Sequence, residues 1–354
     1  MENDVMEQEK ADALQLSAPS ELSEIEKAES VLGIDRSLFE EPKFWSLQKK
    51  RFIKYRKVLW FIIPAALFSL IFSYIPMLGV VFAFKDPGHF NLYRYDLWHE
   101  LTNGYWTINN FGNIFNDKFF VSVGNTLLIN VIKLVICFPL SIFIAVQLSE
   151  LKSQTMAKVV LIVICIPNFL SWAVVIATWA GLLDGDGGAL NTLLVTLKFN
   201  SPNHPLMQEA GLYKFFVIFL SAWKGAGWGC IMFYAGIIAI DKSFYESATL
   251  EGANRLHKMW YLTIPMIIPT IALMLVLNIS GMLATGLEVV LPLFDMILAD
   301  EAQLTLDVYL YDITIVNQNI PMAATLGVFN GLVGLTLMIV GNLVTTKTLH
   351  RGLW

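Results

Sequence analysis

Charged side chains are scarce in this sequence. Asp, Glu, Lys and Arg make up 15% of its 354 residues, whereas hydrophobic residues make up 56% and the mean hydropathy is +0.59. A soluble domain carries about a quarter charged residues, because its surface must be solvated. The deficit excludes an ordinary soluble domain, and the long apolar runs between polar segments indicate an integral membrane protein.

Cysteine and histidine are also few. The three cysteines, Cys137, Cys165 and Cys230, lie inside apolar runs, where a thiol behaves as a small hydrophobe. The five histidines are scattered without the spacing of metal ligands. No Ser-His-Asp set and no paired intramembrane carboxylates can be identified. The sequence therefore predicts no disulfide framework, no metal site and no catalytic residues.

A cleavable signal peptide is lacking too, since it would need a basic start and an early apolar core. Residues 1–42 are instead acidic and too poor in apolar side chains to form a domain, so we expect a disordered or partly helical cytoplasmic arm. A basic juxtamembrane segment follows at residues 43–58.

Six apolar runs are long enough to span a bilayer, which takes roughly 20 helical residues. Transmembrane β-strands would be about ten residues long and would alternate in polarity, which these runs do not. The sequence predicts an all-α domain over residues 59–346, with prolines that kink several helices, and a cytoplasmic tail at 347–354. The expected spans are about Leu59–Phe84, Phe119–Leu148, Val159–Leu183, Phe215–Ile240, Leu262–Leu291 and Pro321–Thr346.

Lys and Arg gather on one side of these spans. They are dense before the first span and recur in the loops after the second and fourth spans and after the last, whereas the other loops hold few. The positive-inside rule therefore places both termini in the cytoplasm, as an even number of spans also requires.

The cytoplasmic segment between the fourth and fifth spans, about residues 241–262, carries helix signals of its own. Ser243 opens an S-x-x-E capping box, which predicts a helix beginning there. Gly252 suits the left-handed position after a helix, and Asn254 can cap a second helix that continues until Pro265 disturbs it. On these residues alone, an ordinary connector and a docking element are equally consistent.

The same segment resembles the EAA loop of permease subunits of binding-protein-dependent ABC importers. That loop has Glu-Ala-Ala, three residues, Gly, nine residues, and then an apolar-x-apolar-Pro end. Ser replaces the usual second residue and keeps it small. The matching residues are Glu246, Ser247, Ala248, Gly252, Leu262, Ile264 and Pro265.

The similarity extends from about Tyr55 to the C-terminus. The run at 56–86 and the stretches TLDVYLYDITI and AATLGVFNGLVGLTLMIVGN resemble the branch of this family that imports complex oligosaccharides, alginate-type importers included. The resemblance implies a type I importer permease of six spans in a bacterial cytoplasmic membrane. It also implies that the loop docks in a cleft of a cytoplasmic ATPase subunit and transmits the opening and closing of that cleft.

The partners implied by the resemblance are a second permease subunit, homologous or identical, two ATPase subunits and an extracytoplasmic solute-binding protein. No G-x-x-x-x-G-K-[ST] phosphate loop occurs, so ATP and Mg²⁺ are expected on the ATPase subunits and no cofactor on this chain. No nucleic-acid partner is expected.

Two lysines lie near the middle of predicted spans, where a charge costs about 2.5–3.5 kcal/mol and needs a partner or a wet cavity. They either pair with carboxylates of the second subunit or line the path and bind an acidic, uronate-type sugar. Three tryptophans can stack on sugar rings or anchor the chain at the bilayer interface. These candidates for the substrate path are Lys133, Lys224, Trp172, Trp223 and Trp228.

An ion-coupled secondary transporter of a small solute is the alternative. That class favours acidic residues within the spans or inverted repeats. Glu288, near the outer end of the fifth predicted span, is the only carboxylate in any of them, and no clear repeat is visible. Copurification of an ATPase subunit would separate the two classes.

Overall fold

The computed structural model describes residues 60–90, 97–102, 105–201, 204–297 and 299–349. Within these residues the chain forms helices and no β-strand, which confirms the predicted all-α class. The predicted acidic arm, the basic segment and residues 350–354 of the tail lie outside the described residues.

The chain divides into two units, residues 1–77 and 78–354. The described part of the first unit is helical throughout, with α3 (Ile62–Ser69), a π-helical turn (Leu70–Tyr74) and α4 (Ile75–Met77). None of these residues is buried, although nearly all are apolar. An apolar helix without a covered face is stable only in lipid or against another protein.

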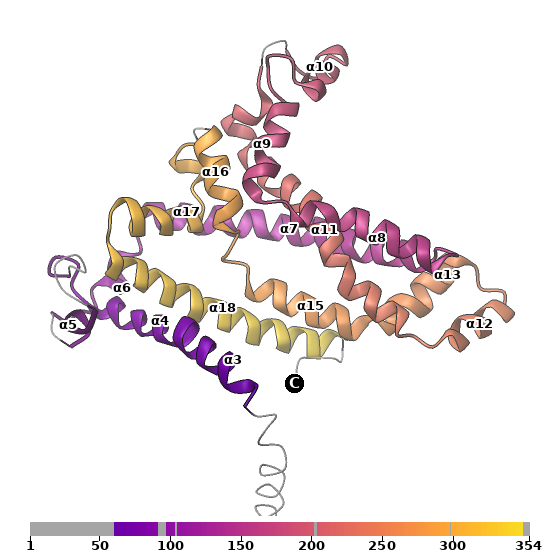
Figure 1. The fold of residues 1–354 in the computed structure, drawn as a ribbon, viewed down its shortest axis with the longest axis horizontal. Coiled ribbons are helices and arrows are strands. Elements are labelled where there is room, and N and C mark those ends of the chain that lie inside the picture. Colours follow the sequence, from indigo (N-terminus) through magenta and orange to yellow (C-terminus); the bar gives the residue numbers. More distant parts are fainter. Residues whose placement is uncertain (1–59, 91–96, 103–104, 202–203, 298, 350–354) are drawn as a thin grey trace, which may run out of the picture. The chain divides into compact units, whose positions relative to one another are not determined.

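The second unit holds the other long helices (Figure 1). A 3-10 helix (Leu78–Phe84) leads into it, and five π or 3-10 turns follow among the described residues. The α-helices in chain order are α5 (Leu97–Thr102), α6 (Asn110–Asn113), α7 (Asp117–Ser149), α8 (Gln154–Phe169), α9 (Trp172–Leu182), α10 (Ala189–Thr196), α11 (Tyr213–Ile238), α12 (Lys242–Leu250), α13 (Arg255–Lys258), α14 (Ile264–Met266), α15 (Ile268–Ser280), α16 (Leu287–Ile297), α17 (Leu306–Tyr311) and α18 (Ile320–Leu349).

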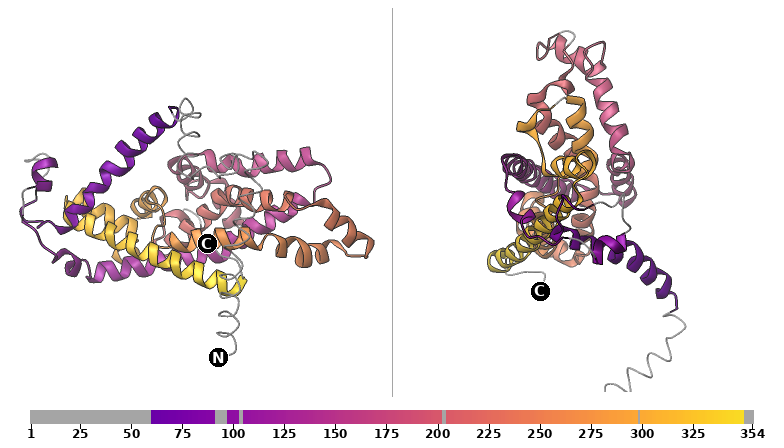
Figure 2. Two further views of the ribbon diagram at one scale, coloured as in Figure 1. Left: turned by 90° about the horizontal axis from the view of Figure 1, so that it is seen from below. Right: turned by 90° about the vertical axis from the view of Figure 1, so that its left-hand side faces the viewer.

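Two groups of helices build this unit. Helix α11 packs along α7 and against α8, and α15 packs along α18 (Figures 1 and 2). Helices α9, α10 and α16 project from the side of the long helices as a lobe, in which α16 contacts α9, α11 and α17. One buried cluster, which includes Tyr213, Leu220 and Leu293, joins this lobe to α7 and α11.

By length and composition, four helices can cross a membrane, and two bent pairs raise the number to six if each pair is one span. The four lie at Ile62–Phe84, Asp117–Ser149, Ala210–Ile238 and Ile320–Thr348. They correspond to the first, second, fourth and sixth predicted spans.

The third predicted span, Val159–Leu183, consists of two helices joined at a sharp bend. Helices α8 and α9 meet at 95°. Ser171 causes the new start, because its hydroxyl accepts a hydrogen bond from the Val174 amide and caps α9. A local cap thus divides a run whose hydropathy is continuous.

The bounds predicted for the fifth span, Leu262–Leu291, were wrong. Its helix bends by 63° at Ile267 and ends at Ser280. Residues 281–286 form turns, and α16 begins separately at Leu287.

Proline accounts for two π-helical turns. Each turn ends two residues before a proline, at Tyr74 before Pro76 and at Thr263 before Pro265. Proline has no amide hydrogen to donate to the carbonyl four residues earlier, and a widened turn absorbs the mismatch.

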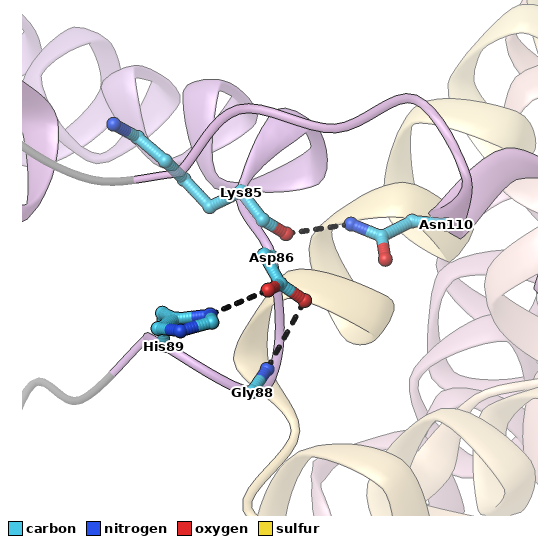
Figure 3. Close-up of polar contacts among 5 residues, drawn as sticks. All are labelled: Lys85, Asp86, Gly88, His89 and Asn110. Carbon is cyan, nitrogen blue, oxygen red and sulfur yellow. Dashed lines mark hydrogen bonds and ion pairs between the residues drawn. The ribbon is translucent and has the colours of Figure 1, made fainter.

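Polar contacts fix the chain where it leaves the 3-10 helix (Figure 3). The Asn110 side-chain amide donates to the Lys85 carbonyl at 2.8 Å. The Asp86 carboxylate accepts from the Gly88 amide at 3.3 Å and lies 2.6 Å from Nδ1 of His89. The bond to His89 holds the pKa of Asp86 below its ordinary value.

Candidate functional site

Helix α12 begins at Lys242 and is capped by Asp241, two residues before the predicted cap. The Asp241 carboxylate accepts a hydrogen bond from the Ser243 amide at 2.9 Å, which holds the pKa of Asp241 below its ordinary value. Ser243 therefore lies inside the helix, and the predicted capping box was wrong. Asp is at least as good a cap as Ser, so the first suitable residue in the chain takes the position.

The other end of α12 follows the prediction. The Ala253 amide donates to the Ala248 carbonyl at 2.9 Å, and the Gly252 amide donates to the Thr249 carbonyl at 3.0 Å. These two hydrogen bonds define a Schellman motif. Gly252 has φ +82°, a left-handed conformation that L side chains disfavour. The predicted left-handed glycine is confirmed.

Asn254 starts the second helix as predicted, because its side chain accepts from the His257 amide at 2.8 Å. Two side-chain bonds tie this helix back to α12. Lys258 Nζ donates to Thr249 Oγ1 at 2.7 Å, and the hydroxyls of Tyr245 and Thr263 are 3.1 Å apart. We call α12 to α14, residues 242–266, the hairpin.

The residues that match the EAA pattern are spread over both arms of the hairpin. Glu246, Ser247, Gly252 and Pro265 are exposed, whereas Ala248, Leu262 and Ile264 are half-buried. Apolar side chains beside them are also exposed, with Leu250 at 90% and Tyr261 at 77%. A polar hairpin with exposed apolar side chains is a surface that a partner can cover.

The cap at Asp241 gives a first testable prediction. Asp241→Ala removes the acceptor of the Ser243 amide, so we expect faster hydrogen exchange across the first turn of α12, whereas Asp241→Asn keeps an acceptor and slow exchange. Because the pKa of Asp241 is lowered in the folded state, the native cap persists above the ordinary Asp pKa and is lost as pH falls through the lowered value. Equal exchange in both variants would contradict this role.

Two adjoining cavities lie beside α7 and α11. The larger, of about 510 Å³, is also bordered by α9 and by residues 285–289, and the smaller, of about 360 Å³, by α15. Both are lined by Lys133, Ser221 and Gly225. Their volumes lie within the range of small-molecule sites, roughly 300–1,000 Å³.

The larger cavity unites the two lysines with one of the tryptophans. Lys224 is 8% exposed, and its ammonium lies 4.3 Å from the ring centre of Trp172. Lys133 Nζ lies 3.5 Å from the Thr285 carbonyl, a long hydrogen bond. Glu288, in the first turn of α16, lines the same cavity. Within the described part of the chain, no carboxylate oxygen lies within 4.0 Å of either ammonium.

The turns at 281–286 form one border of both cavities and are held by distant side chains. The Asn130 amide of α7 donates to the Met282 carbonyl at 2.9 Å and to the Thr285 hydroxyl at 3.2 Å. The Asp307 carboxylate accepts from the amides of Thr285 at 2.7 Å and of Gly286 at 3.3 Å. An asparagine inside an apolar run was visible in the sequence, but its partners, about 150 residues away, were not.

Two of the candidate tryptophans lie elsewhere. Trp223 packs edge-on against Trp179, with ring centres 5.6 Å apart, and Trp228 packs edge-on against Phe169 at 6.5 Å. Neither lines the two cavities just described. A place for Trp223 or Trp228 on the substrate path stays a prediction.

Comparison with known proteins assigns the chain. Residues 137–348, more than half of its length, match the family described as "Binding-protein-dependent transport system inner membrane component". The chain belongs to this family. The permease is therefore a transport subunit and not an enzyme, and it is a multi-pass inner membrane component of an ABC importer that works with a solute-binding protein. The alternative of an ion-coupled transporter falls with this assignment.

Relatives cover nearly the whole permease. It is 31% identical over 324 residues to the "Polygalacturonan/rhamnogalacturonan transport system permease protein YteP" of Bacillus subtilis (strain 168), which covers 91% of this chain and 97% of that protein. "Protein LplB" of the same organism is 29% identical over 293 residues, 83% of this chain and 89% of that one.

Solved structures share the fold. A chain of "a bacterial ABC transporter involved in the import of the acidic polysaccharide alginate" superposes with a TM-score of 0.70 at 24% identity, over 85% of this chain and 99% of that one. A second structure of a bacterial alginate ABC transporter, "in complex with alginate pentasaccharide-bound periplasmic protein", has the same TM-score and identity over 88% and 100% of the two chains. The type I ABC permease fold predicted for this chain is confirmed.

Proposed function

We propose that this permease is one half of the membrane pathway of an ATP-driven importer of oligosaccharides, and that its substrates contain uronate units. The observation that carries the proposal is the 31% identity, along almost all of both chains, to a permease named for polygalacturonan and rhamnogalacturonan transport. The cavity lined by Lys133 and Lys224 supports the proposal. A polyuronate carries one carboxylate on each uronate unit, and a lysine ammonium forms charge-assisted hydrogen bonds with carboxylates.

The proposed assembly contains a second permease subunit, two cytoplasmic ATPase subunits and an extracytoplasmic binding protein that delivers the sugar. Transport then proceeds by alternating access, in which ATP binding and hydrolysis shift the populations of inward-open and outward-open states.

The hairpin is proposed as the contact with the ATPase, with Glu246, Ser247, Ala248 and Gly252 on its first arm. Both ends of α12 are capped and two side-chain bonds join the arms, so the hairpin moves as one body. A rigid element at this position can transmit the motion of an ATPase subunit to the fifth span.

The test is uptake by the importer reconstituted in proteoliposomes with its binding protein and ATPase subunits. We expect ATP-dependent import of galacturonate or alginate oligosaccharides. Import of neutral oligosaccharides alone would overturn the uronate assignment, and import without ATP or without the binding protein would overturn the mechanism.

The proposed orientation, with both termini in the cytoplasm, gives a separate prediction. Gln154 and Asp186 are exposed and lie at opposite ends of the third span. In intact cells, a membrane-impermeant maleimide should label Asp186→Cys, and it should label Gln154→Cys only after the membrane is opened. The unaltered chain, whose cysteines lie within apolar helices, is the control. Reversed labelling would overturn the orientation and the ATPase contact together.

A further inference from the structure

We propose that Lys224, Lys133 and Trp172 form a subsite for a single uronate unit, in which the carboxylate meets the lysines and the sugar ring stacks on the tryptophan. The inference rests on the proposed function and deepens it, because it assigns the selection of the charged substrate to particular side chains of the larger cavity.

Lys224 is the strongest indication. Its side chain is more than nine-tenths buried, at a depth where charge is costly, yet in the described part of the chain no carboxylate reaches its ammonium. The face of Trp172, at 4.3 Å, offers only the partial negative charge of a π-system. A carboxylate placed in the cavity would form a charge-assisted hydrogen bond, which is a stronger interaction for the same ammonium.

The position of Trp172 adds a second role. The ammonium of Lys224 covers one face of the indole ring. A ligand carboxylate that draws the ammonium away uncovers that face, and the C–H groups of a pyranose ring, which carry partial positive charge, can take the place of the ammonium. One movement of Lys224 therefore creates both halves of the subsite.

Lys133 supplies the second positive charge of the cavity. Its ammonium has three donors, and among the described residues it makes one hydrogen bond, to the Thr285 carbonyl, which is 3.5 Å long. It borders both cavities, so it lies where a chain of sugar units would pass from one to the other. Hydroxyl groups of the sugar find polar partners nearby in Asn168 and Ser221.

Glu288 is the competing partner for these lysines, because it lines the same cavity. The residues that line the cavity include two lysines and one glutamate, and the Asp307 carboxylate lies behind this lining on the Thr285 and Gly286 amides. If Glu288 were only the structural counter-ion of these lysines, loss of a lysine would weaken the import of charged and neutral substrates alike.

The experiment compares two ligands that differ only at their carboxyl groups. Trigalacturonate and its fully methyl-esterified form have the same length and rings, and each is offered to the reconstituted importer after loading of the binding protein. The same importer is also solubilised in detergent. There, competition against a labelled substrate gives affinities that do not depend on delivery by the binding protein. Lys224→Met should weaken binding of the acid by roughly tenfold or more relative to binding of the ester. Lys133→Met should change these affinities in the same direction.

The controls separate charge from packing. Lys224→Arg should retain most of the preference for the acid. Trp172→Leu should weaken binding of the acid and of the ester equally, because ring stacking does not depend on the carboxylate. Lys214→Met removes a half-buried lysine from the first turn of the same helix, outside both cavities, and should leave the preference unchanged.

Equal losses for acid and ester in Lys224→Met, or no loss for either, would overturn the subsite alone. A wild-type importer that takes neither compound would overturn the proposed function, and the subsite with it.

Discussion

Glu246→Lys should abolish uptake while the permease still inserts into the membrane. Glu246 is exposed in the middle of α12, and no hydrogen bond joins its side chain to the described residues, so its replacement costs this chain little. The reversed charge is nevertheless held in place, because Asp241 and Gly252 fix both ends of the helix. We therefore expect a loss of more than tenfold in both uptake and substrate-stimulated ATP hydrolysis, through repulsion of the ATPase subunit.

The matched control is Glu251→Lys. Glu251 is exposed at the C-terminal end of the same helix and lies outside the positions that match the EAA pattern. The substitution makes the same change of charge as Glu246→Lys, and we expect uptake to remain at more than half of the wild-type value. Copurification of the ATPase should fail for Glu246→Lys and succeed for Glu251→Lys. Equal behaviour of the two variants would show that net charge, and not this position, matters.

Gly227→Val should disrupt the packing of the permease itself. A Cβ atom at Gly227 would clash with the carbonyl oxygen of Ile164 and would lie 2.6 Å from its carbonyl carbon. Both atoms belong to the backbone of α8, so no side-chain rotation relieves the clash and α8 must separate from α11. We expect a loss of about 2–3 kcal/mol or more, seen as a lower melting temperature in detergent.

Gly225→Ala serves as the comparison for folding. It lies on the same helix two residues earlier, and a Cβ atom there would meet nothing within 4 Å. Its melting temperature should match or exceed that of the wild type, because alanine also favours helix. A Gly227→Val permease that melts like Gly225→Ala would mean that α8 and α11 do not pack as closely as described.

Hydropathy predicted the helical class and the approximate location of every span, because bilayer thickness sets a minimum length for any apolar helix. It failed where polar groups decide. Ser171 begins a new helix inside a continuous apolar run, and Asn130 and Asp307 hold turns where a helix was expected. Hydropathy averages over such single residues, and their partners lie far away in sequence.

The candidate site was predicted unevenly for the same reason. The ends of these short helices depend on neighbours in the sequence, so the roles of Gly252 and Asn254 could be predicted. The N-cap of α12 was placed wrongly, because Asp241 and not Ser243 is the cap. The cavity depends on how α7, α9 and α11 pack. Sequence indicated that the lysines at 133 and 224 needed partners, but only packing could place Trp172 beside one of them.

The fifth span connects two places that have so far been treated separately. At one end it is continuous with the hairpin that carries Glu246, and at the other it leads into the turns that Asn130 and Asp307 hold. Between them lies α15, 13 residues or about 20 Å of stiff helix. A displacement of the hairpin that is passed through the 63° bend at Ile267 to α15 would shift the turn before Thr285, whose carbonyl is the acceptor of Lys133. In the proposed mechanism, the fifth span would therefore link nucleotide binding by the ATPase to how tightly the ammonium of Lys133 is held within the membrane.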